Sequence, residues 1–286
     1  MEMSVKKLLK RASAVLIRSL SFFVPSQVLF RSLLVVRRTE DAFHRRWGLP
    51  ISFQKWIDHL YYSLRPSIVQ TTLGQAVFYV RLNDPFHYDL VLGKHEPAIH
   101  KWLTKNVSRG MTVIDVGSNI GSYTLDIAAL VGTEGVVIAV EADPATAMIL
   151  KKNIQANGVS QVQVIEGAAY RTNGHARLGR AAASTGYTGL YYGKAAEWLE
   201  VPAFTLDSVV RRLGLQNLDM VKIDVEGAEL DVVAGMTELL QTKRPTILIE
   251  LHPAAVPAVS NLPSQLRQAG YRVEMLTRDH LIASPS

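Results

Sequence analysis

The sequence predicts an α/β fold built on a mostly parallel sheet with helices on both faces. Residues 111–144 read as a strand, a glycine-containing loop, a helix and a second strand, which together make one βαβ unit. Two further apolar runs, at 220–229 and 246–251, lead into acidic residues and are separated by a helical pattern. A chain of 286 residues with a hydrophobic fraction of 48% is large enough for one such domain with an appendage.

The positive charge of the chain is concentrated at its N-terminus. The net charge is +6, but residues 1–46 carry ten Lys/Arg against three Asp/Glu, whereas the remainder carries 21 against 22. Residues 4–24 predict a helix that begins after Ser4 and ends before Pro25, with an apolar stripe and a basic face. Such an amphipathic arm fits either an anionic membrane surface or a helix packed on its own domain, and both alternatives stay open.

Several classes of protein are disfavoured by composition. Charged residues and Pro25 interrupt the apolar N-terminal region, so no window reaches the ~18 apolar residues that a membrane-spanning helix requires. A signal peptide is not expected, because basic residues persist through the apolar stretch. The absence of cysteine excludes a disulfide framework and a thiolate metal site. No nucleic-acid partner is expected, since aromatic residues are not interleaved with the basic ones. We expect a cytoplasmic protein, with peripheral docking at the inner face of a membrane through residues 1–46 as the open alternative.

A small extension is expected between the arm and the main domain, at residues 47–95. Two runs rich in β-branched and aromatic residues flank Leu73-Gly74-Gln75, which is typical of a β-hairpin. A helix at 98–106 then leads toward the first strand of the main domain, which spans residues 96–286.

The loop after the first strand predicts a cofactor site. Gly117 and Gly121 allow the backbone to turn sharply and to approach a ligand beside the N-terminus of the next helix. Glu141 ends the second strand about twenty residues later, where it can accept hydrogen bonds from ribose hydroxyls. Asn119 stands where a dinucleotide fingerprint needs glycine, and Asp115 brings negative charge that a pyrophosphate does not tolerate. The loop therefore favours a nucleoside cofactor with an ammonium group, S-adenosylmethionine, over a nicotinamide dinucleotide.

The following elements complete this predicted site. Asp143 and Pro144 begin a helix that stops at Gly158, and small residues after a third strand at 162–165 leave room for an adenine ring. Residues 171–200 lack a helical period and form either a lid over the acceptor or a hairpin excursion. The expected cofactor-binding residues are Asp115, Gly117, Ser118, Asn119, Gly121, Glu141, Ala142, Gly167 and Ala168.

The second half of the chain predicts the catalytic edge. After a strand at 201–206, Asp207 is placed to cap a short helix. Asp224 and Glu226 then follow a buried strand that begins at Met220, and a helical pattern runs on to Leu240. Glu250 and His252 end the next strand, and ligands of open α/β sheets bind at such carboxyl ends of strands. All four side chains are therefore expected beside the glycine loop.

In order, the segments DVGSNIG, VEADP, TLDSV, VKIDVEGAE and RPTILIELH resemble those of the FkbM family of S-adenosylmethionine-dependent methyltransferases. The resemblance covers roughly residues 96–251, and Ser118 stands where the family usually has alanine. It implies a Rossmann-like class I fold with a seven-stranded sheet. It also implies methylation of a hydroxyl group on a sugar, a glycolipid or a natural product.

Methyl transfer to a hydroxyl requires an in-line approach and a base that takes the proton. Asp224 is the first candidate for this base, and His252 is the second because a neutral imidazole titrates nearer to working pH. A divalent cation held by Asp224, Glu226 and Glu250 stays open, since hard cations prefer oxygen ligands. Two other classes also stay open: a non-catalytic, membrane-docked protein that binds a nucleoside cofactor, and a nicotinamide-dependent oxidoreductase.

Overall fold

The computed structural model describes residues 28–33, 61, 68–82, 84–93, 95–180, 188–191, 195–252 and 256–286. The chain divides into two units, residues 1–95 and 96–286. The helix predicted at 4–24 lies outside the described residues, whereas 28–33 are helical. Among the described helices, none combines the length and apolar character that crossing a membrane requires.

The described part of the N-terminal unit centres on a hairpin of β1 (Ile68–Leu73) and β2 (Ala76–Arg81), which pair antiparallel. The predicted hairpin is therefore confirmed. The helix α4 (Pro85–Val91) follows, and the side chain of Asp84 caps it by accepting a hydrogen bond from the amide of Phe86 at 3.0 Å.

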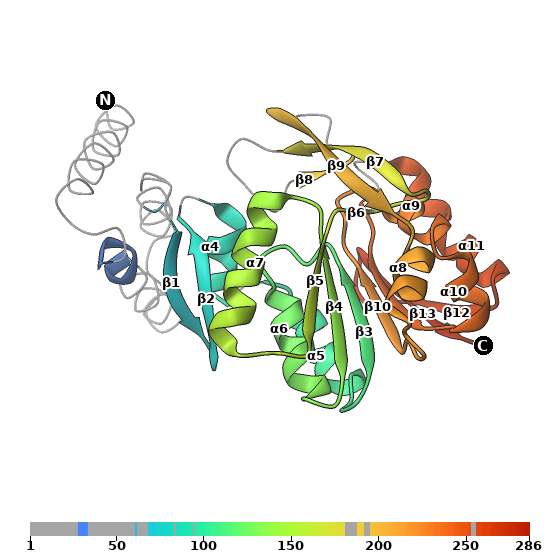
Figure 1. Ribbon diagram of the computed structural model, residues 1–286, viewed down its shortest axis with the longest axis horizontal. Coiled ribbons are helices and arrows are strands. Elements are labelled where there is room, and N and C mark those ends of the chain that lie inside the picture. The colour runs from blue at the N-terminus through green and yellow to red at the C-terminus, as the bar shows by residue number, and fades with distance from the viewer. Residues whose placement is uncertain are drawn as a thin grey trace, which may run out of the picture. The chain divides into compact units, whose positions relative to one another are not determined.

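The larger unit is built on a seven-stranded sheet in the order β12-β13-β11-β10-β3-β4-β5 (Figure 1). Neighbouring strands from β11 to β5 are parallel, and β13 is antiparallel to both β11 and β12. The order reverses between β3 and β10, which is the ligand-binding switch point of doubly wound sheets. The predicted, mostly parallel sheet is confirmed, with strands β3 (Thr112–Val116), β4 (Val136–Glu141), β5 (Val162–Glu166), β10 (Met220–Ile223), β11 (Thr246–Glu250), β12 (Tyr271–Met275) and β13 (His280–Pro285).

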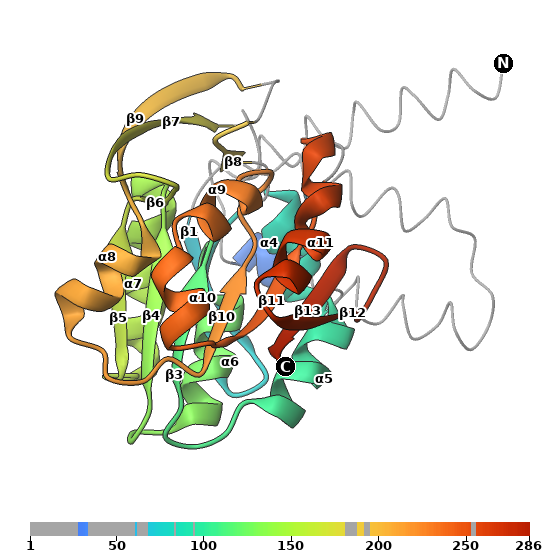
Figure 2. The same ribbon diagram turned by 90° about the vertical axis from the view of Figure 1, so that its right-hand side faces the viewer.

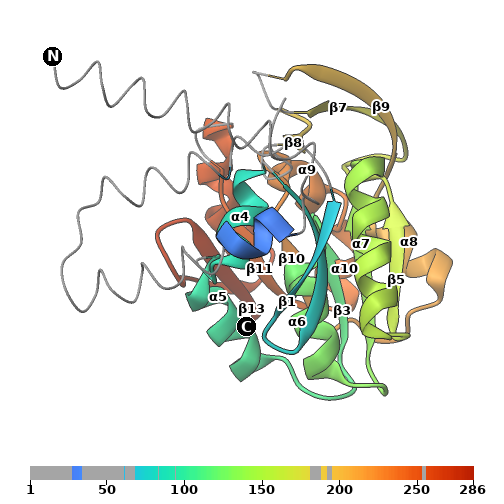
Figure 3. The same cartoon turned by 90° about the vertical axis from the view of Figure 1, so that its left-hand side faces the viewer.

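Helices cover both faces of this sheet, because successive side chains of each buried strand point to opposite sides. Val113 packs on the side of α5 and α6, whereas its neighbour Ile114 packs on the side of α8 to α11 (Figure 2). The helix α7 lies along β4 and β5 (Figure 3). The helices are α5 (Pro97–Asn106), α6 (Ser122–Val131), α7 (Pro144–Asn157), α8 (Leu206–Leu213), α9 (Glu229–Ala234), α10 (Thr237–Thr242) and α11 (Leu262–Gln268), the last preceded by the 3-10 turn η2 (Pro257–Asn261).

The helix termini follow their sequence signals in one case and depart from them in another. Asp143 caps α7 and Gly158 ends it with a φ of 63°, as predicted. The prediction that Asp207 caps α8 is wrong, because Thr205 accepts the hydrogen bond from Ser208 at that terminus. The carboxylate of Asp207 instead accepts the first-turn amides of α10, at 2.9 and 3.0 Å.

The excursion between β5 and α8 forms a second sheet in the order β6-β9-β7-β8. Its strands are β6 (Ala168–Ala169), β7 (Gly174–Arg180), β8 (Thr188–Gly189) and β9 (Glu197–Phe204). Because β6 follows directly on β5, this sheet lies beyond the carboxyl end of the main sheet (Figure 1). The antiparallel pairing of β7 with β9 confirms a hairpin in this segment, and a role as a lid over the acceptor stays a prediction.

Candidate active site

On the face of the sheet that packs on α5 and α6, apolar side chains give way to ionisable ones at the carboxyl edge. Side chains two residues apart in a strand lie on the same face of the sheet. In each of four strands, a buried apolar residue on this face is followed, two residues nearer the edge, by an ionisable one. The four successive pairs are Val113 and Asp115, Met220 and Lys222, Leu248 and Glu250, and Ile282 and His280. Strand register then sets Asp115 beside Lys222 and Glu250 beside His280. The core layer therefore ends in a cluster of charges.

Lys222 is the buried cation of this cluster. Its Nζ lies 3.5 Å from Asp115 Oδ1 and 3.4 Å from Asp224 Oδ2, and 4.6 Å from the centre of the Tyr123 ring. Burial works to lower the pKa of Lys222, but the charges of Asp224 and Asp115 outweigh it and raise the pKa above its usual range. The side chain stays an ammonium group and balances two carboxylates.

Asp115 is directed into the protein. Its side chain is fully buried, and Oδ2 accepts a hydrogen bond from Thr124 Oγ1 at 2.6 Å. Because Lys222 balances its charge, Asp115 does not make the loop repel phosphate as the sequence argument assumed. Asp115 therefore links the strand before the loop to α6 and to Lys222.

The two loop glycines are required by packing. Gly117 has a φ of 77°, and a Cβ there would overlap the backbone carbonyl of Asp224. Gly121 has a φ of 95°, and a Cβ there would lie 2.7 Å from Leu150 Cδ1. Both positions therefore favour glycine even without a ligand, and their positive φ angles confirm the predicted sharp turn. The close approach of Gly117 to Asp224 joins the loop to the catalytic edge at the switch point.

Glu141 joins the loop to the end of the second strand. One carboxylate oxygen accepts the amide of Asn119 and the other that of Asp143, each at 2.8 Å. Burial is the main cause that raises the pKa of Glu141 to about 7. A carboxylate has about four acceptor sites, so two remain for further donors such as ribose hydroxyls.

The remaining predicted cofactor residues are small and lie along the same loops. Ser118 is buried and donates its hydroxyl to the carbonyl of Asp115 at 2.7 Å. A Cβ at Gly167 would lie 2.7 Å from the carbonyl oxygen of Pro202 and 2.8 Å from Phe204 Cε1. Packing against β9 by itself therefore leaves no room for a side chain at Gly167. Ala142 is partly buried, and Ala168 pairs with β9.

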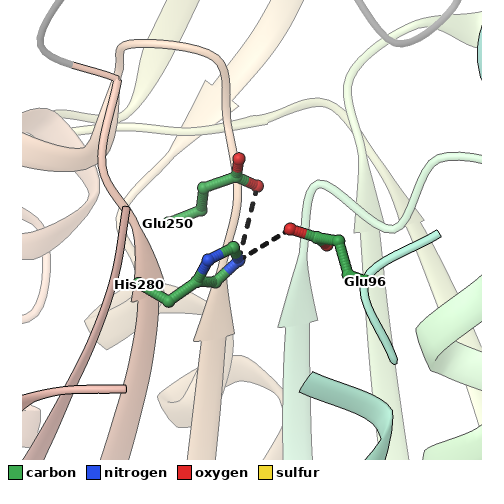
Figure 4. Close-up of side chains that lie close together, drawn as sticks. All are labelled: Glu96, Glu250 and His280. Carbon is green, nitrogen blue, oxygen red and sulfur yellow. Dashed lines mark ion pairs between the residues drawn. The ribbon is translucent and has the colours of Figure 1, made fainter. Parts of the chain in front are cut away.

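One imidazole at the edge is held between two carboxylates (Figure 4). His280 Nε2 lies 3.1 Å from Glu96 Oε1 and 3.7 Å from Glu250 Oε2. Glu96 also accepts a hydrogen bond from the hydroxyl of Tyr123. Glu96 comes from the start of α5, Glu250 from the end of β11 and His280 from the start of β13.

A second imidazole, His252, lies beside another group of acids. Its Nδ1 is 2.6 Å from Glu229 Oε1, and its Nε2 is 3.5 Å from Glu226 Oε2 and 3.6 Å from Glu250 Oε1. Burial lowers the pKa of His252, but the hydrogen bond to Glu229 and the nearby acids raise it to about 10. The sequence argument for His252 as a neutral base is therefore corrected: without a bound cation the ring is an imidazolium at neutral pH.

The acids of this edge are crowded. Burial first, and then the charge of Asp224, raise the pKa of Glu226 to about 8 and that of Glu250 to about 9. In the described part of the chain, Asp224 and Glu226 converge with His252, whereas Glu250 converges with Glu96 and His280. The three acids predicted as one cation-ligand set thus divide between two clusters.

The sequence argument missed five residues of the edge: Glu96, Tyr123, Lys222, Glu229 and His280. Lys222 had a detectable signal, because it lies in an apolar strand two residues before Asp224 and therefore on the same side of the chain. Glu229 begins α9, and its contact with His252 joins residues that are distant in sequence. Glu96 lies at the start of α5, and His280 lies at the start of the antiparallel strand β13. The residues next to them in the sequence form no recognisable motif.

A family model matches more than half of the chain. Residues 115–273 match the family described as the Methyltransferase FkbM domain. The doubly wound sheet, with a glycine loop and an acid-ended second strand at its switch point, defines a Rossmann-like class I methyltransferase fold. The chain belongs to the FkbM methyltransferase family, whose cofactor is S-adenosylmethionine.

Similarity to individual proteins is more local. The chain is 36% identical over 107 residues to Protein-L-isoaspartate O-methyltransferase 1 of Arabidopsis thaliana, covering 37% of this chain and 45% of that protein. It is 38% identical over 60 residues to a probable cobalt-precorrin-6B C(15)-methyltransferase of Sulfolobus acidocaldarius, covering 21% and 31%. The matched segments thus span less than half of either relative. The solved Methyltransferase FkbM from Methylobacillus flagellatus has a TM-score of 0.44 at 13% identity, covering 70% of this chain and 55% of that chain.

The site fits S-adenosylmethionine. The buried carboxylate of Glu141 has acceptor capacity left for two ribose hydroxyls, beside the loop amide of Asn119. Asp224, partly exposed at the facing strand end, provides negative charge for an ammonium or sulfonium group. These groups come from the ends of β3, β4 and β10, at and beside the switch point.

Proposed function

We propose that this chain is an S-adenosylmethionine-dependent O-methyltransferase that acts on a hydroxyl of a sugar, a glycolipid or a natural product. The observation that carries the proposal is the contact between the cofactor loop and the acidic edge. The backbone of Asp224 packs on Gly117, and the amide of Asp224 donates to the carbonyl of Val116 at 3.0 Å. The carboxylate of Asp224 therefore belongs to the same crevice as the loop.

When bound, S-adenosylmethionine supplies an electrophilic methyl group on a sulfonium centre. Glu141 would bind the ribose hydroxyls. The loop amide of Asn119, which donates to Glu141, would hold this carboxylate in place. Asp224 would face the reacting end, where a carboxylate stabilises positive charge and can accept the proton of an acceptor hydroxyl.

Asp224 is the better of the two candidate bases. Its side chain is 21% exposed, so an acceptor hydroxyl can reach it. His252 already holds a proton on the Glu229 side, and its raised pKa keeps a second proton on the other nitrogen. An imidazolium next to the acceptor would orient an oxygen atom by donating a hydrogen bond to it.

The N-terminal arm suggests where the acceptor is found. We include in the proposal that residues 1–46 dock on an anionic membrane surface near a lipid-linked acceptor. Support comes from the charge of this segment, which has ten Lys/Arg against three Asp/Glu. Each basic residue near such a surface contributes about 1 kcal/mol, weakened by salt.

Calorimetry and a turnover screen test the proposal. The purified chain should bind S-adenosylmethionine and should not bind NAD, because Asn119 replaces the glycine that a pyrophosphate needs. Methyl transfer from labelled cofactor should then be detected on hydroxylated glycans, glycolipids or polyketides. Binding without transfer to any acceptor would favour a non-catalytic protein, and NAD binding would favour an oxidoreductase.

A further inference from the structure

We propose that Asp224, Glu226 and His252 form a binding site for one divalent transition-metal cation. The ligands would be one oxygen from each carboxylate and Nε2 of the imidazole, a mixed set that suits Mn²⁺ or Zn²⁺. The site deepens the proposed function, since it lies at the edge where the acceptor would react. Cation binding nevertheless stands apart from methyl transfer, because it needs neither cofactor nor acceptor.

The spacing of the three groups suits a cation. One ligand atom from each of them lies within 4.8 Å of the other two. Two atoms bound to one metal at about 2.1 Å are separated by roughly 3.0–3.4 Å at octahedral or tetrahedral angles. His252 Nε2 and Glu226 Oε2 lie 3.5 Å apart, so these two atoms need little movement to share one cation.

The hydrogen bonding of His252 also indicates Nε2 as the atom that binds the cation. A carboxylate only accepts hydrogen bonds, so Glu229 Oε1, 2.6 Å away, fixes a proton on Nδ1. Nε2 is then the ring nitrogen that a cation would bind on the side of Glu226, by displacing the proton which this nitrogen carries in the cation-free protein. Metal-bound histidines typically donate their other N–H group to a carboxylate in this way.

Glu229 has the properties of that supporting carboxylate. Its side chain is fully buried, and Oε1 also accepts the amide of Gly227 at 2.9 Å. Its second oxygen, Oε2, has no hydrogen-bond partner among the described residues. A buried carboxylate that is incompletely paired is costly, and a divalent cation one imidazole away would offset its charge.

The neighbouring cluster of Glu96, Glu250 and His280 lacks this arrangement (Figure 4). The hydroxyl oxygen of Thr277 accepts the amides of Asp279 and His280, so its own hydrogen is directed to His280 Nδ1 at 3.0 Å. In the neutral ring the proton then lies on Nε2, which faces Glu96 and Glu250. This cluster is therefore a hydrogen-bonded group, and it provides a matched control.

Manganese binding to the full-length chain tests the site. After removal of metals with EDTA, Mn²⁺ alone is titrated in, and the loss of the free-ion EPR signal reports binding. The expected result is one Mn²⁺ per chain, with electron spin-echo modulation from a directly bound imidazole nitrogen. His252→Ala should abolish the nitrogen signal, whereas His280→Ala should retain it.

Affinity measurements on the same samples assign the remaining groups. Glu226→Gln should weaken Mn²⁺ binding at least tenfold, and Glu229→Gln by about ten- to a hundredfold as an orienting residue. His280→Asn should change the affinity less than about twofold. Circular dichroism and binding of S-adenosylmethionine show whether each variant is folded.

The outcomes separate the two proposals. A folded wild-type chain that binds no Mn²⁺, or that loses the nitrogen signal in His280→Ala and not in His252→Ala, would overturn the cation site. Methyl transfer that persists in EDTA-treated protein would leave cation binding and the methyltransferase activity as independent properties. Mn²⁺ binding without any methyl transfer would support the site and count against the proposed function.

Discussion

The backbone carbonyl of Asp224 occupies the space that a side chain at Gly117 would need. This contact joins the end of β10 to the loop after β3, where the strand order of the parallel part of the sheet reverses. The cofactor loop and the acidic edge are consequently one structural unit. A substitution that displaces the backbone of one of them should also displace the other.

Gly117→Ala should destabilise the fold and weaken cofactor binding. The residue has a φ of 77°, and the added methyl group would overlap the carbonyl of Asp224. We expect a loss of more than about 2 kcal/mol in the free energy of unfolding, from backbone strain and overlap together. Urea denaturation measures it. Gly158→Ala is the matched control, because its φ is 63° but the space around it is open, so only about 1 kcal/mol of strain is expected.

Glu141→Ala should weaken binding of S-adenosylmethionine by about 1 to 3 kcal/mol, because ribose hydroxyls would lose a charged acceptor. The loop amides of Asn119 and Asp143 would lose their acceptor as well. Calorimetry on the folded variant measures the change. Unaltered affinity would show that the ribose is held by other groups.

The pKa of Glu141, raised to about 7 chiefly by burial, predicts a pH dependence. Ribose hydroxyls donate to the ionised form, so cofactor affinity should rise as pH increases through 7, and binding should release a proton. In the cofactor-free protein, the contribution of Glu141 to folding stability changes with pH in the opposite direction. A raised folded-state pKa adds stability that is complete below pH 4.5 and is lost as pH rises through 7.

Glu141→Gln cannot ionise and is the control for this pH dependence. Its cofactor affinity should not change between about pH 6 and 8, the range in which Glu141, with a pKa of about 7, titrates in the wild-type chain. An equally steep profile in the variant would assign the titration to another group.

Asp224→Asn should reduce turnover by on the order of a hundredfold or more if this residue takes the acceptor proton, with a smaller effect on cofactor affinity. The assay is run at saturating Mn²⁺, so that weaker cation binding does not limit the rate. If Asp224→Asn stays active and His252→Ala is inactive, the two roles are reversed.

Lys222→Met should destabilise the chain by about 3 to 5 kcal/mol, because it leaves Asp115 buried without its cation. The double variant Lys222→Met/Asp115→Asn should recover part of that loss, since it removes the unpaired charge. Thermal or urea unfolding measures both. Arg211→Met is the control: its ion pair with Glu238 is exposed, so the expected loss is less than about 1 kcal/mol.

Deletion of residues 1–46 should abolish binding to vesicles that contain anionic lipid. The full-length chain should co-sediment with them and be released by high salt, because the attraction is electrostatic. Cofactor affinity should stay the same. Equal sedimentation of the truncated chain, or its failure to fold, would instead indicate a helix packed on its own domain.

Much of the fold could be predicted from the sequence, since its determinants are local. The alternation and length of apolar runs predicted the parallel strands, and Asp143 with Gly158 predicted the bounds of α7. The order in which strands pair is not local, but the βαβ connections restrict it strongly. The glycine loop, the acid at the end of β4 and the acids after β10 and β11 were likewise visible in the sequence.

What the sequence by itself determined is therefore the class of the protein and the edge of the sheet at which its ligands bind. Tertiary structure decided which side chains meet at that edge. Lys222 balances Asp115 through strand register, and Glu96 and His280 arrive from elements distant in sequence. It also decided the charge of His252, because four nearby acids outweigh burial and raise the pKa of the imidazole. Packing and electrostatics depend on distances in space, and spacing along the chain leaves those distances undetermined.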